Sequence, residues 1–169
     1  MEFDTTRPAN RPIGTVFAPE FFQVAYVTTD IDQAVEVLGQ RYGIQKFGPL
    51  DTPLPNGGIM KIRLAWLGPM MIEIIDATKA GMEMYSSVLP EDGFAIRHHH
   101  LGYFIKDDAQ WDALHKTLKA QDMPVVFGGV APGDMLRFSY IKAPEMGHYL
   151  EYVQLYGPGK ELFDSVPRN

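Results

Sequence analysis

The stretch HHHLGYFIKDDA (residues 98–109) follows the same pattern as FFQVAYVTTDID (residues 21–32), and this repetition decides the fold. Each stretch has the aromatic and branched residues of a β-strand, followed by acidic residues of the kind that begin a helix. Gln23 in the first stretch corresponds to His100 in the second, a shift of 77 residues. The sequence therefore predicts two related structural units.

The repeat extends beyond these two stretches. Each unit is expected to contain one strand, one helix and three further strands. Asp30 is the expected N-cap of the first helix, and Asp107 or Asp108 that of the second. The first unit is predicted at 20–29, 30–44, 45–50, 59–68 and 69–77. The second is predicted at 97–106, 107–123, 124–129, 135–143 and 147–155.

This order predicts an α+β fold of two βαβββ modules. The modules are placed at 20–76 and 96–156, with a connecting loop at 77–95. An extended N-terminal arm is expected over residues 1–19, because they carry few apolar residues and no periodicity. Residues 157–169 are expected to form a C-terminal tail.

Composition narrows the class of protein. The net charge is −6 and there is no run of Lys or Arg, so we expect no nucleic-acid partner. The chain has no cysteine, which excludes disulfides and thiolate ligands. The N-terminus does not resemble a signal peptide, and the apolar runs are too short to span a membrane. A soluble, cytoplasmic protein is the expectation.

Four polar side chains stand at matching positions of the two predicted modules. Gln23 and His100 lie on the first strand of each module, and Glu73 and Glu151 lie on the last, 78 residues apart. A charged carboxylate in an apolar strand is costly unless a cation accompanies it. For Glu73 that cation could be a metal ion or, alternatively, a lysine or arginine of the adjacent strand (Lys61 or Arg63). Taken alone, Gln23 would more often be a buried amide that is bonded to backbone.

The three histidines before Leu101 are expected to differ in role. Because side chains alternate along a strand, His98 and His100 should face one side and His99 the other. His100 matches Gln23 in register and is the predicted metal ligand. His98 is then a candidate for substrate contact near the rim, and His99 a packing residue.

These positions resemble the vicinal oxygen chelate superfamily, which includes glyoxalase I, methylmalonyl-CoA epimerase, extradiol dioxygenases and bleomycin-resistance proteins. The matching strings are QVAY, EII, HLGY and EYVQ, within residues 20–156. The resemblance implies that the two modules lie edge to edge, forming a cupped mixed β-sheet with helices on the outside. It also implies that one divalent metal ion is bound by Gln23, Glu73, His100 and Glu151.

One nitrogen and three oxygen donors suit a five- or six-coordinate ion such as Zn²⁺, Ni²⁺, Co²⁺, Mn²⁺ or Mg²⁺. Such an ion acts as a Lewis acid. Glu151 or Glu73 could then act as general base. The predicted function is that of an isomerase or lyase of the glyoxalase type, which abstracts a proton next to a metal-chelated oxygen. The alternatives are a metal-free sequestration protein of the bleomycin-resistance type and, third, a ring-cleaving dioxygenase.

The sequence departs from each family member. Val27 and Ala77 replace an Arg and an Asn that help glyoxalase I to hold glutathione, which argues against a glutathione substrate. Dioxygenases have His at the position of Gln23, and the epimerase pattern differs at both Gln23 and Glu73.

The residues expected to line the cup are apolar, which predicts a small hydrophobic or aromatic oxygenated molecule as the partner. Met71, Phe104 and Tyr149 are on the predicted ligand face, and the connecting loop adds Met82 and Tyr85. Arg63 is the candidate for a substrate carboxylate or oxyanion, with Arg137 as a second candidate. A homodimer is also expected, because strand edges are left exposed.

Overall fold

The structure is a computed structural model, and it describes residues 16–54, 57–78 and 82–169. Most of the predicted N-terminal arm (1–19) and a short part of the predicted loop (77–95) lie outside these residues. Among the described residues, no helix has both the length and the apolar character needed to cross a membrane.

The elements occur in two similar series, followed by one more helix. The first series is β1 (Glu20–Thr28), α1 (Ile31–Tyr42), β2 (Gly48–Pro49), β3 (Thr52–Pro53), β4 (Ile59–Leu67) and β5 (Met70–Asp76). The short helix α2 (Glu83–Ser86) lies between the series. The second series is β6 (Ile96–Phe104), α3 (Asp108–Ala120), β7 (Val125–Val130), the 3₁₀ turn η1 (Pro132–Asp134), β8 (Leu136–Ala143) and β9 (His148–Leu155).

All the strands among the described residues join one nine-stranded mixed sheet. Its order is β2-β4-β5-β1-β6-β9-β8-β7, and β3 pairs with β4. β1 is parallel to β5, β6 is parallel to β9, and the two series meet where β1 and β6 pair antiparallel. The two halves of the order therefore mirror each other, which confirms the predicted α+β fold of two βαβββ modules. The first strands of both modules are central, and the last strand of each flanks them.

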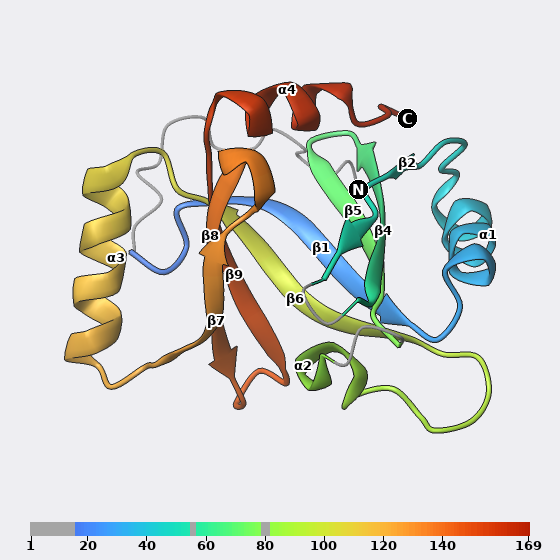
Figure 1. Cartoon of the computed structure of the whole chain (residues 1–169), viewed down its shortest axis with the longest axis horizontal. Helices are drawn as coiled ribbons and strands as arrows, with labels where there is room; N and C mark the ends of the chain where they lie inside the picture. The colour runs from blue at the N-terminus through green and yellow to red at the C-terminus, as the bar shows by residue number, and fades with distance from the viewer. Residues whose placement is uncertain (1–15, 55–56, 79–81) are drawn as a thin grey trace, which may run out of the picture.

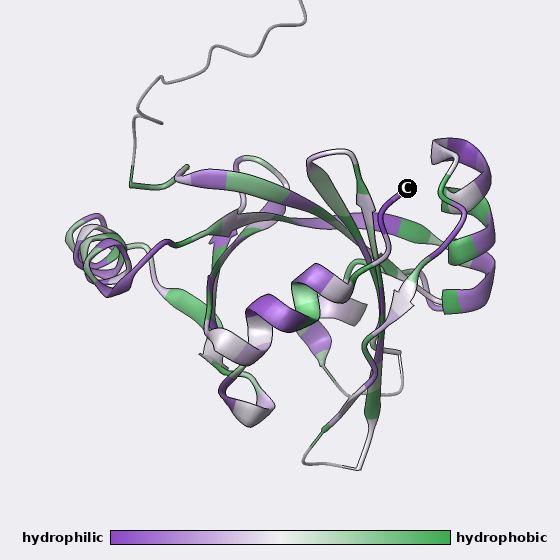
Figure 2. Ribbon diagram, turned by 90° about the horizontal axis from the view of Figure 1, so that it is seen from above, coloured by the Kyte–Doolittle hydropathy of each residue, from purple (hydrophilic) through white to green (hydrophobic). Residues whose placement is uncertain are grey.

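The sheet curves into a cup, as Figures 1 and 2 show from two directions. Helices α1 and α3 lie outside it at opposite ends, α2 lies at one rim, and α4 crosses the other (Figure 1). Helix α4 (Gly157–Ser165) occupies the segment that the sequence left as a tail. Its buried residue Phe163 packs among side chains inside the cup.

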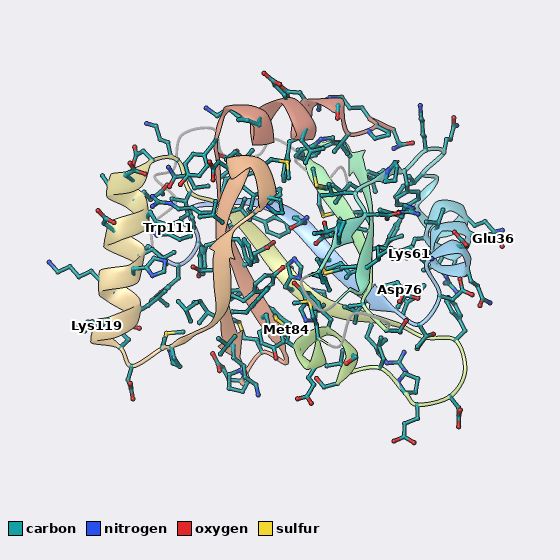
Figure 3. All side chains as sticks on the ribbon, viewed as in Figure 1. Glu36, Lys61, Asp76, Met84, Trp111 and Lys119 are labelled. Carbon is teal, nitrogen blue, oxygen red and sulfur yellow. The ribbon has the colours of Figure 1, made fainter. Side chains whose placement is uncertain are left out.

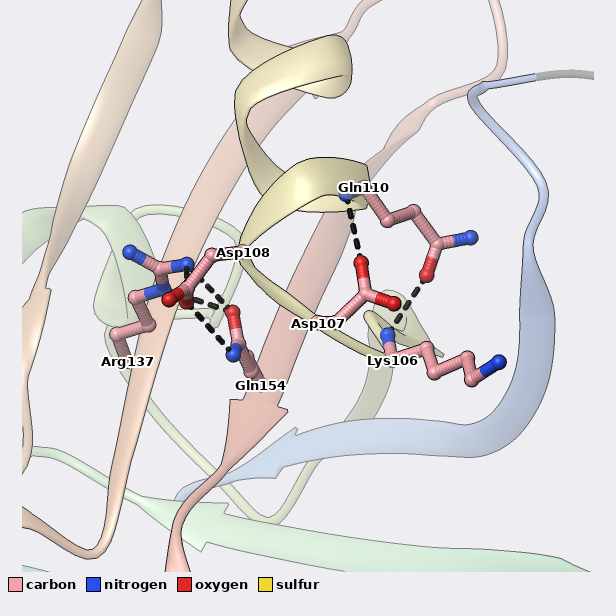
Figure 4. A network of polar contacts seen from close by, with 6 residues as sticks. All are labelled: Lys106, Asp107, Asp108, Gln110, Arg137 and Gln154. Atoms are coloured by element: carbon pink, nitrogen blue, oxygen red, sulfur yellow. Dashed lines mark hydrogen bonds and ion pairs between the residues drawn. The ribbon is translucent and has the colours of Figure 1, made fainter.

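The two outer helices begin where the sequence predicts. The Asp30 carboxylate accepts hydrogen bonds from two backbone N–H groups of the first turn of α1. Gly43 ends that helix with φ of +72°, a conformation that glycine adopts without a steric penalty. Asp107, rather than Asp108, caps α3 by accepting from the backbone N–H of Gln110 (Figure 4).

Asp108 instead joins α3 to the outer face of the sheet, in a cluster that we call the α3 clamp: Asp108, Arg137 and Gln154 (Figure 4). The Arg137 guanidinium donates to the Gln154 side-chain oxygen at 2.6 and 2.9 Å and lies 2.6 Å from Asp108 Oδ1. It also lies 4.3 Å from the centre of the Trp111 ring. Arg137, a candidate substrate contact, is therefore engaged on the side of the sheet away from the cup.

Candidate metal site

The inner face of the cup is built by alternation along the strands. On β5, Met71 and Ile75 pack inside the cup, while Ile72 and Ile74 pack outside against α1. Glu73 therefore faces inward. The same parity on β9 turns Glu151 inward, because Val153 packs inside and Tyr152 outside.

Strand pairing brings these positions together. Ala25 of β1 is paired on one side with Glu73 and on the other with His100. Gly102 is paired with Gln23 on one side and with Glu151 on the other. The four predicted ligands therefore lie on four adjacent central strands at nearly the same height.

Three of the four groups converge on one point. His100 Nε2 lies 3.2 Å from Glu73 Oε2 and 3.2 Å from Glu151 Oε2. The possible ligand atoms of the three residues all lie within 4.8 Å of one another. All four groups are buried, with exposed fractions of 3% for Gln23, 8% for Glu73, 0% for His100 and 9% for Glu151.

The charges in this cluster perturb one another. Burial lowers the pKa of His100, but attraction to the Glu151 and Glu73 carboxylates outweighs it and raises the pKa from 6.5 to about 9. Burial raises the pKa of Glu73, and the nearby Glu151 adds to this effect, while His100 opposes it. A protonated His100 carries one positive charge, which can balance only one of the two carboxylates when both are ionised.

The cluster fits a divalent cation. Among the described residues, Gln23 Oε1, Glu73 Oε2 and His100 Nε2 are buried without an aligned hydrogen bond. Buried polar atoms of this kind are rare in native proteins and call for an explanation. A divalent ion would use these atoms as ligands, and with a neutral His100 its charge would balance both carboxylates. We therefore assign Gln23, Glu73, His100 and Glu151 as the residues that could hold the ion.

Glycine at position 102 makes room for the Gln23 side chain. A Cβ atom at this position would lie 2.6 Å from Gln23 Oε1 and 2.8 Å from Gln23 Cβ. The Gln23 amide N–H group is directed at the Met71 sulfur, 3.7 Å away. This contact leaves the amide oxygen as the free end of the side chain, and a hydrogen bond from backbone, the alternative for Gln23, is not observed.

The alternative cations for Glu73 face away from it, since Lys61 is exposed and Arg63 bonds to other groups. Lys61 is paired in register with Asp76 at the edge of the cup, and both are labelled in Figure 3. Arg63 donates to Asp51 at 2.6 Å and to the Ile62 carbonyl at 2.8 Å. The cation next to Glu73 in the structure is therefore His100.

The predicted faces of His98 and His99 are wrong, because a β-bulge interrupts the alternation. Ala25 pairs with His100 and the next residue, Tyr26, pairs with His98, so His99 is the extra residue. His98 is exposed and lies on the outside, against Tyr26 and His148. A role for His98 in binding a substrate inside the cup is not supported by this position.

His99 instead turns into the cup and contacts His100. Their Nδ1 atoms are 2.9 Å apart, and His99 Nε2 is 3.0 Å from the Met84 carbonyl oxygen. Burial and the neighbouring His100 lower the pKa of His99 to about 3, so its ring is neutral. Sequence reasoning missed this residue, because nothing in a run of three histidines marks which one is the bulge.

A cavity of about 290 Å³ opens above the carboxylates. Gln23, Glu73 and Glu151 are on its wall, and almost all the other described lining residues are apolar or aromatic. None of them carries a positive charge. The lining includes Phe22, Leu54, Met60, Ile62, Ile75, Met82, Tyr85, Phe127, Phe138, Tyr140, Val153 and Phe163.

The other predicted substrate contacts lie at or behind this wall. Phe104 stacks on the lining residue Phe22, with ring centres 3.7 Å apart. Tyr149 packs on His99 at 4.9 Å, and Met71 supports the Gln23 amide. Arg63 is not among the described residues that line the cavity, because it alternates with Ile62 and Leu64, which do.

Two tyrosines cover the histidines on the cavity side. The Tyr140 ring meets the His100 ring edge-on at 5.1 Å, and the Tyr85 ring lies 4.7 Å from that of His99. Burial raises the pKa of both phenols, and the carboxylate of Glu151 raises them further. Both hydroxyls are therefore neutral and able to donate hydrogen bonds.

Comparison of this geometry with solved structures gives clear matches. Methylmalonyl-CoA epimerase of Mycobacterium tuberculosis aligns over 86% of this chain and 93% of its own, with 16% identity and a TM-score of 0.57. A variant of the Streptomyces coelicolor epimerase in complex with 2-nitronate-propionyl-CoA aligns over 82% and 98%, with 17% identity and a TM-score of 0.59. A hypothetical protein of Bacillus halodurans aligns over 82% and 95%, with 16% identity and a TM-score of 0.58.

This chain has the vicinal oxygen chelate fold. The predicted resemblance is confirmed at the level of the fold, since identities of 16–17% show no more than that. No family model matches the sequence, and no curated protein matches it. What the fold does in this chain depends on its own residues.

Proposed function

We propose that this protein holds one divalent metal ion through Gln23, Glu73, His100 and Glu151. We further propose that it acts as an isomerase or lyase on a small hydrophobic oxygenated compound. One observation carries the proposal: two buried carboxylates and a buried imidazole converge within 4.8 Å at the wall of an apolar cavity. Burying two like charges this way costs stability, and a ligand that needs them explains why they are there.

The reaction would combine the ion with a base from the chain. When bound, the ion supplies a Lewis acid that stabilises negative charge developing on a substrate oxygen. Glu73 and Glu151 both line the cavity, so either carboxylate could accept a proton from a C–H group next to that oxygen. The neutral hydroxyls of Tyr85 and Tyr140 could donate hydrogen bonds, and the apolar wall would exclude water.

The cavity favours an uncharged substrate. No Lys, Arg or His is among its described lining residues, so a phosphate or a second carboxylate would have no countercharge on the wall. The Streptomyces coelicolor neighbour is in complex with 2-nitronate-propionyl-CoA. For this chain we propose instead a hydroxyketone or β-dicarbonyl compound with an apolar body, since such a compound offers two neighbouring oxygens.

A second candidate is a metal-free binding protein of the bleomycin-resistance type. The 3.2 Å contacts of His100 with both carboxylates favour it, because a protonated His100 partly neutralises the cluster without an ion. Such a protein would sequester an apolar compound in the same cavity. The homodimer and the cytoplasmic location remain predictions from the sequence.

Metal analysis and proton exchange separate the two candidates. Protein purified without an affinity tag is expected to contain about one divalent ion per chain. It should also exchange the acidic C–H of a suitable hydroxyketone or β-dicarbonyl for deuterium in D₂O, as followed by NMR, and a chelator should stop this exchange. A wild-type protein that takes up no Zn²⁺, Ni²⁺, Co²⁺, Mn²⁺ or Mg²⁺, yet binds apolar compounds, would establish the sequestration protein.

A further inference from the structure

His99 lies between a backbone carbonyl and the candidate metal ligand His100. It is buried, with 1% of its surface exposed. Its Nε2 atom is 3.0 Å from the Met84 oxygen and its Nδ1 atom is 2.9 Å from His100 Nδ1. The sequence predicted only packing for His99, and this residue is not one of the four proposed metal ligands.

The chemistry of the three groups fixes the direction of both hydrogen bonds. A carbonyl oxygen only accepts, so His99 Nε2 must carry a proton and donate it to Met84. A neutral imidazole has one N–H group, so His99 Nδ1 is left as an acceptor. The partner at 2.9 Å must then be the donor, and that partner is His100 Nδ1.

The direction of the hydrogen bond between the two Nδ1 atoms decides whether His100 Nε2 has a free lone pair. With its proton held on Nδ1, a neutral His100 has a free lone pair on Nε2, the atom that lies 3.2 Å from each carboxylate. The same bond persists when His100 is protonated, because Nδ1 is then still a donor. The hydrogen bond from His100 to His99 is thus independent of the charge of His100.

We propose that His99 is a positioning residue that keeps the Nδ1 proton on His100 and thereby presents His100 Nε2 to a metal ion. The inference rests on the proposed metal site and adds to it the group that orients its only nitrogen ligand. Supporting hydrogen bonds of this kind commonly fix the tautomer and ring orientation of a ligating histidine.

Packing keeps the His99 ring in place. It packs against two tyrosine rings, with centres 4.7 Å away for Tyr85 and 4.9 Å away for Tyr149. The bulge in β6 supplies the backbone geometry, since regular alternation would turn His99 out of the cup. Helix α2, which carries Met84, supplies the terminal acceptor (Figure 3).

Loss of the acceptor should have a defined consequence. Without His99 Nδ1, the proton on His100 Nδ1 is buried and unsatisfied. The other tautomer, with the proton on Nε2 near the two carboxylates, is then favoured. That tautomer cannot ligate a metal through Nε2, so metal affinity should fall although all four ligands remain.

The first test is NMR of ¹⁵N-labelled wild-type protein without metal. We expect a proton on His100 Nδ1, a proton on His99 Nε2, and a scalar coupling across the hydrogen bond between the two Nδ1 atoms. A proton on His99 Nδ1, or no coupling between the two Nδ1 atoms, would overturn the inference. This result does not depend on metal binding, so it stands even if the proposed function fails.

The second test is calorimetric titration with Zn²⁺ of matched variants. His99→Leu removes the acceptor at similar volume and should weaken Zn²⁺ binding roughly 10–100-fold. His99→Asn keeps an oxygen acceptor near Nδ1 and should recover most of that loss. The control His115→Asn, on α3 outside the cup, should bind as the wild type does.

The outcomes distinguish the two proposals. If His99→Leu folds, by circular dichroism, and binds Zn²⁺ as tightly as the wild type, the role of His99 is disproved while the metal site stands. If the wild type binds no Zn²⁺ or other divalent ion, the proposed function fails while the NMR result still decides the hydrogen bond. If His99→Leu does not fold, the NMR measurement on the wild type alone decides the matter.

Discussion

Two charged clusters lie on opposite faces of the sheet, share strand β9 and are built in opposite ways. On β9, Glu151 points into the cup while Gln154 points out to the α3 clamp. In the clamp, the Asp108 carboxylate, the Arg137 guanidinium and the Gln154 amide bond one another at 2.6–3.1 Å. In the candidate metal site, atoms of Gln23, Glu73 and His100 are buried without an aligned hydrogen bond.

The difference separates polar groups that attach a helix to the sheet from polar groups that the proposed metal ion would use as ligands. The clamp is partly exposed and satisfies its own charges, so its loss should cost little stability. The candidate metal site is buried, brings two carboxylates together and faces a cavity. Its arrangement lowers stability unless something binds there. Variants of the candidate metal site should therefore weaken metal binding. Variants of the clamp should leave metal binding unchanged and cost little stability.

The largest expected difference is in metal binding. Glu73→Gln and Glu151→Gln each remove one anionic ligand with little change in shape, so the loss of affinity should exceed the roughly 10–100-fold typical of a supporting group. Asp108→Asn removes a carboxylate from the clamp and should leave the metal content unchanged. Elemental analysis after dialysis measures all three, and equal metal content in the three variants would contradict the assignment of the site.

The pH dependence of stability should come from the metal site. The pKa of His100 is raised to about 9 in the folded protein, so its contribution is complete below about 6.5 and is lost as pH rises through 9. A tenfold change in proton affinity is worth about 1.4 kcal/mol, which gives a loss of up to about 3 kcal/mol. Urea denaturation of the metal-free protein from pH 6 to 10 measures this loss. His100→Asn should flatten the curve; an unchanged curve in that variant would assign the dependence to another group.

Gly102→Ala tests whether the Gln23 amide needs the space beside it. The added Cβ would lie 2.6 Å from Gln23 Oε1, so the variant should lose about 1–3 kcal/mol of unfolding free energy and bind metal more weakly. Gly129→Ala is the matched control, because its Cβ would meet nothing within 4 Å. Denaturation and metal titration of both variants provide the measurement, and equal behaviour would show that Gln23 is not constrained.

The smallest effect is expected in the clamp. Arg137→Met removes a partly exposed ion pair with Asp108 and a contact with the Trp111 ring, at a cost of about 1 kcal/mol. Metal content and pH dependence should stay those of the wild type. A large loss of metal in this variant would mean that the two faces of the sheet are coupled.

Much of the fold follows from local patterns. Alternating strands, the Asp30 cap and Gly43 at the end of α1 depend on neighbours in sequence, and they are where the sequence predicts them. Helix α4 is an exception. Its amphipathic pattern is short, and its position was set by packing of Phe163 into the cup.

The four ligand candidates were predictable because they stand at matching positions of the two repeated modules. The shared shift between Gln23 and His100 and between Glu73 and Glu151 indicated four equivalent positions, and the structure places all four inside the cup. The roles of His98 and His99 could not be obtained in this way. Alternation holds only while pairing is regular, and the register shift opposite Ala25 and Tyr26 reverses the two side chains.

The sequence by itself determined the repeated βαβββ order, the strand parity of the four ligand candidates and the absence of cysteine and of basic runs. These features depend on residue types and on spacing along the chain. Only the tertiary structure decided that His99 contacts His100, that Arg137 belongs to the clamp, and that no positive charge is among the described lining residues of the cavity. Those facts depend on which strands pair and in which register, and side-chain direction in a sheet is a consequence of that pairing.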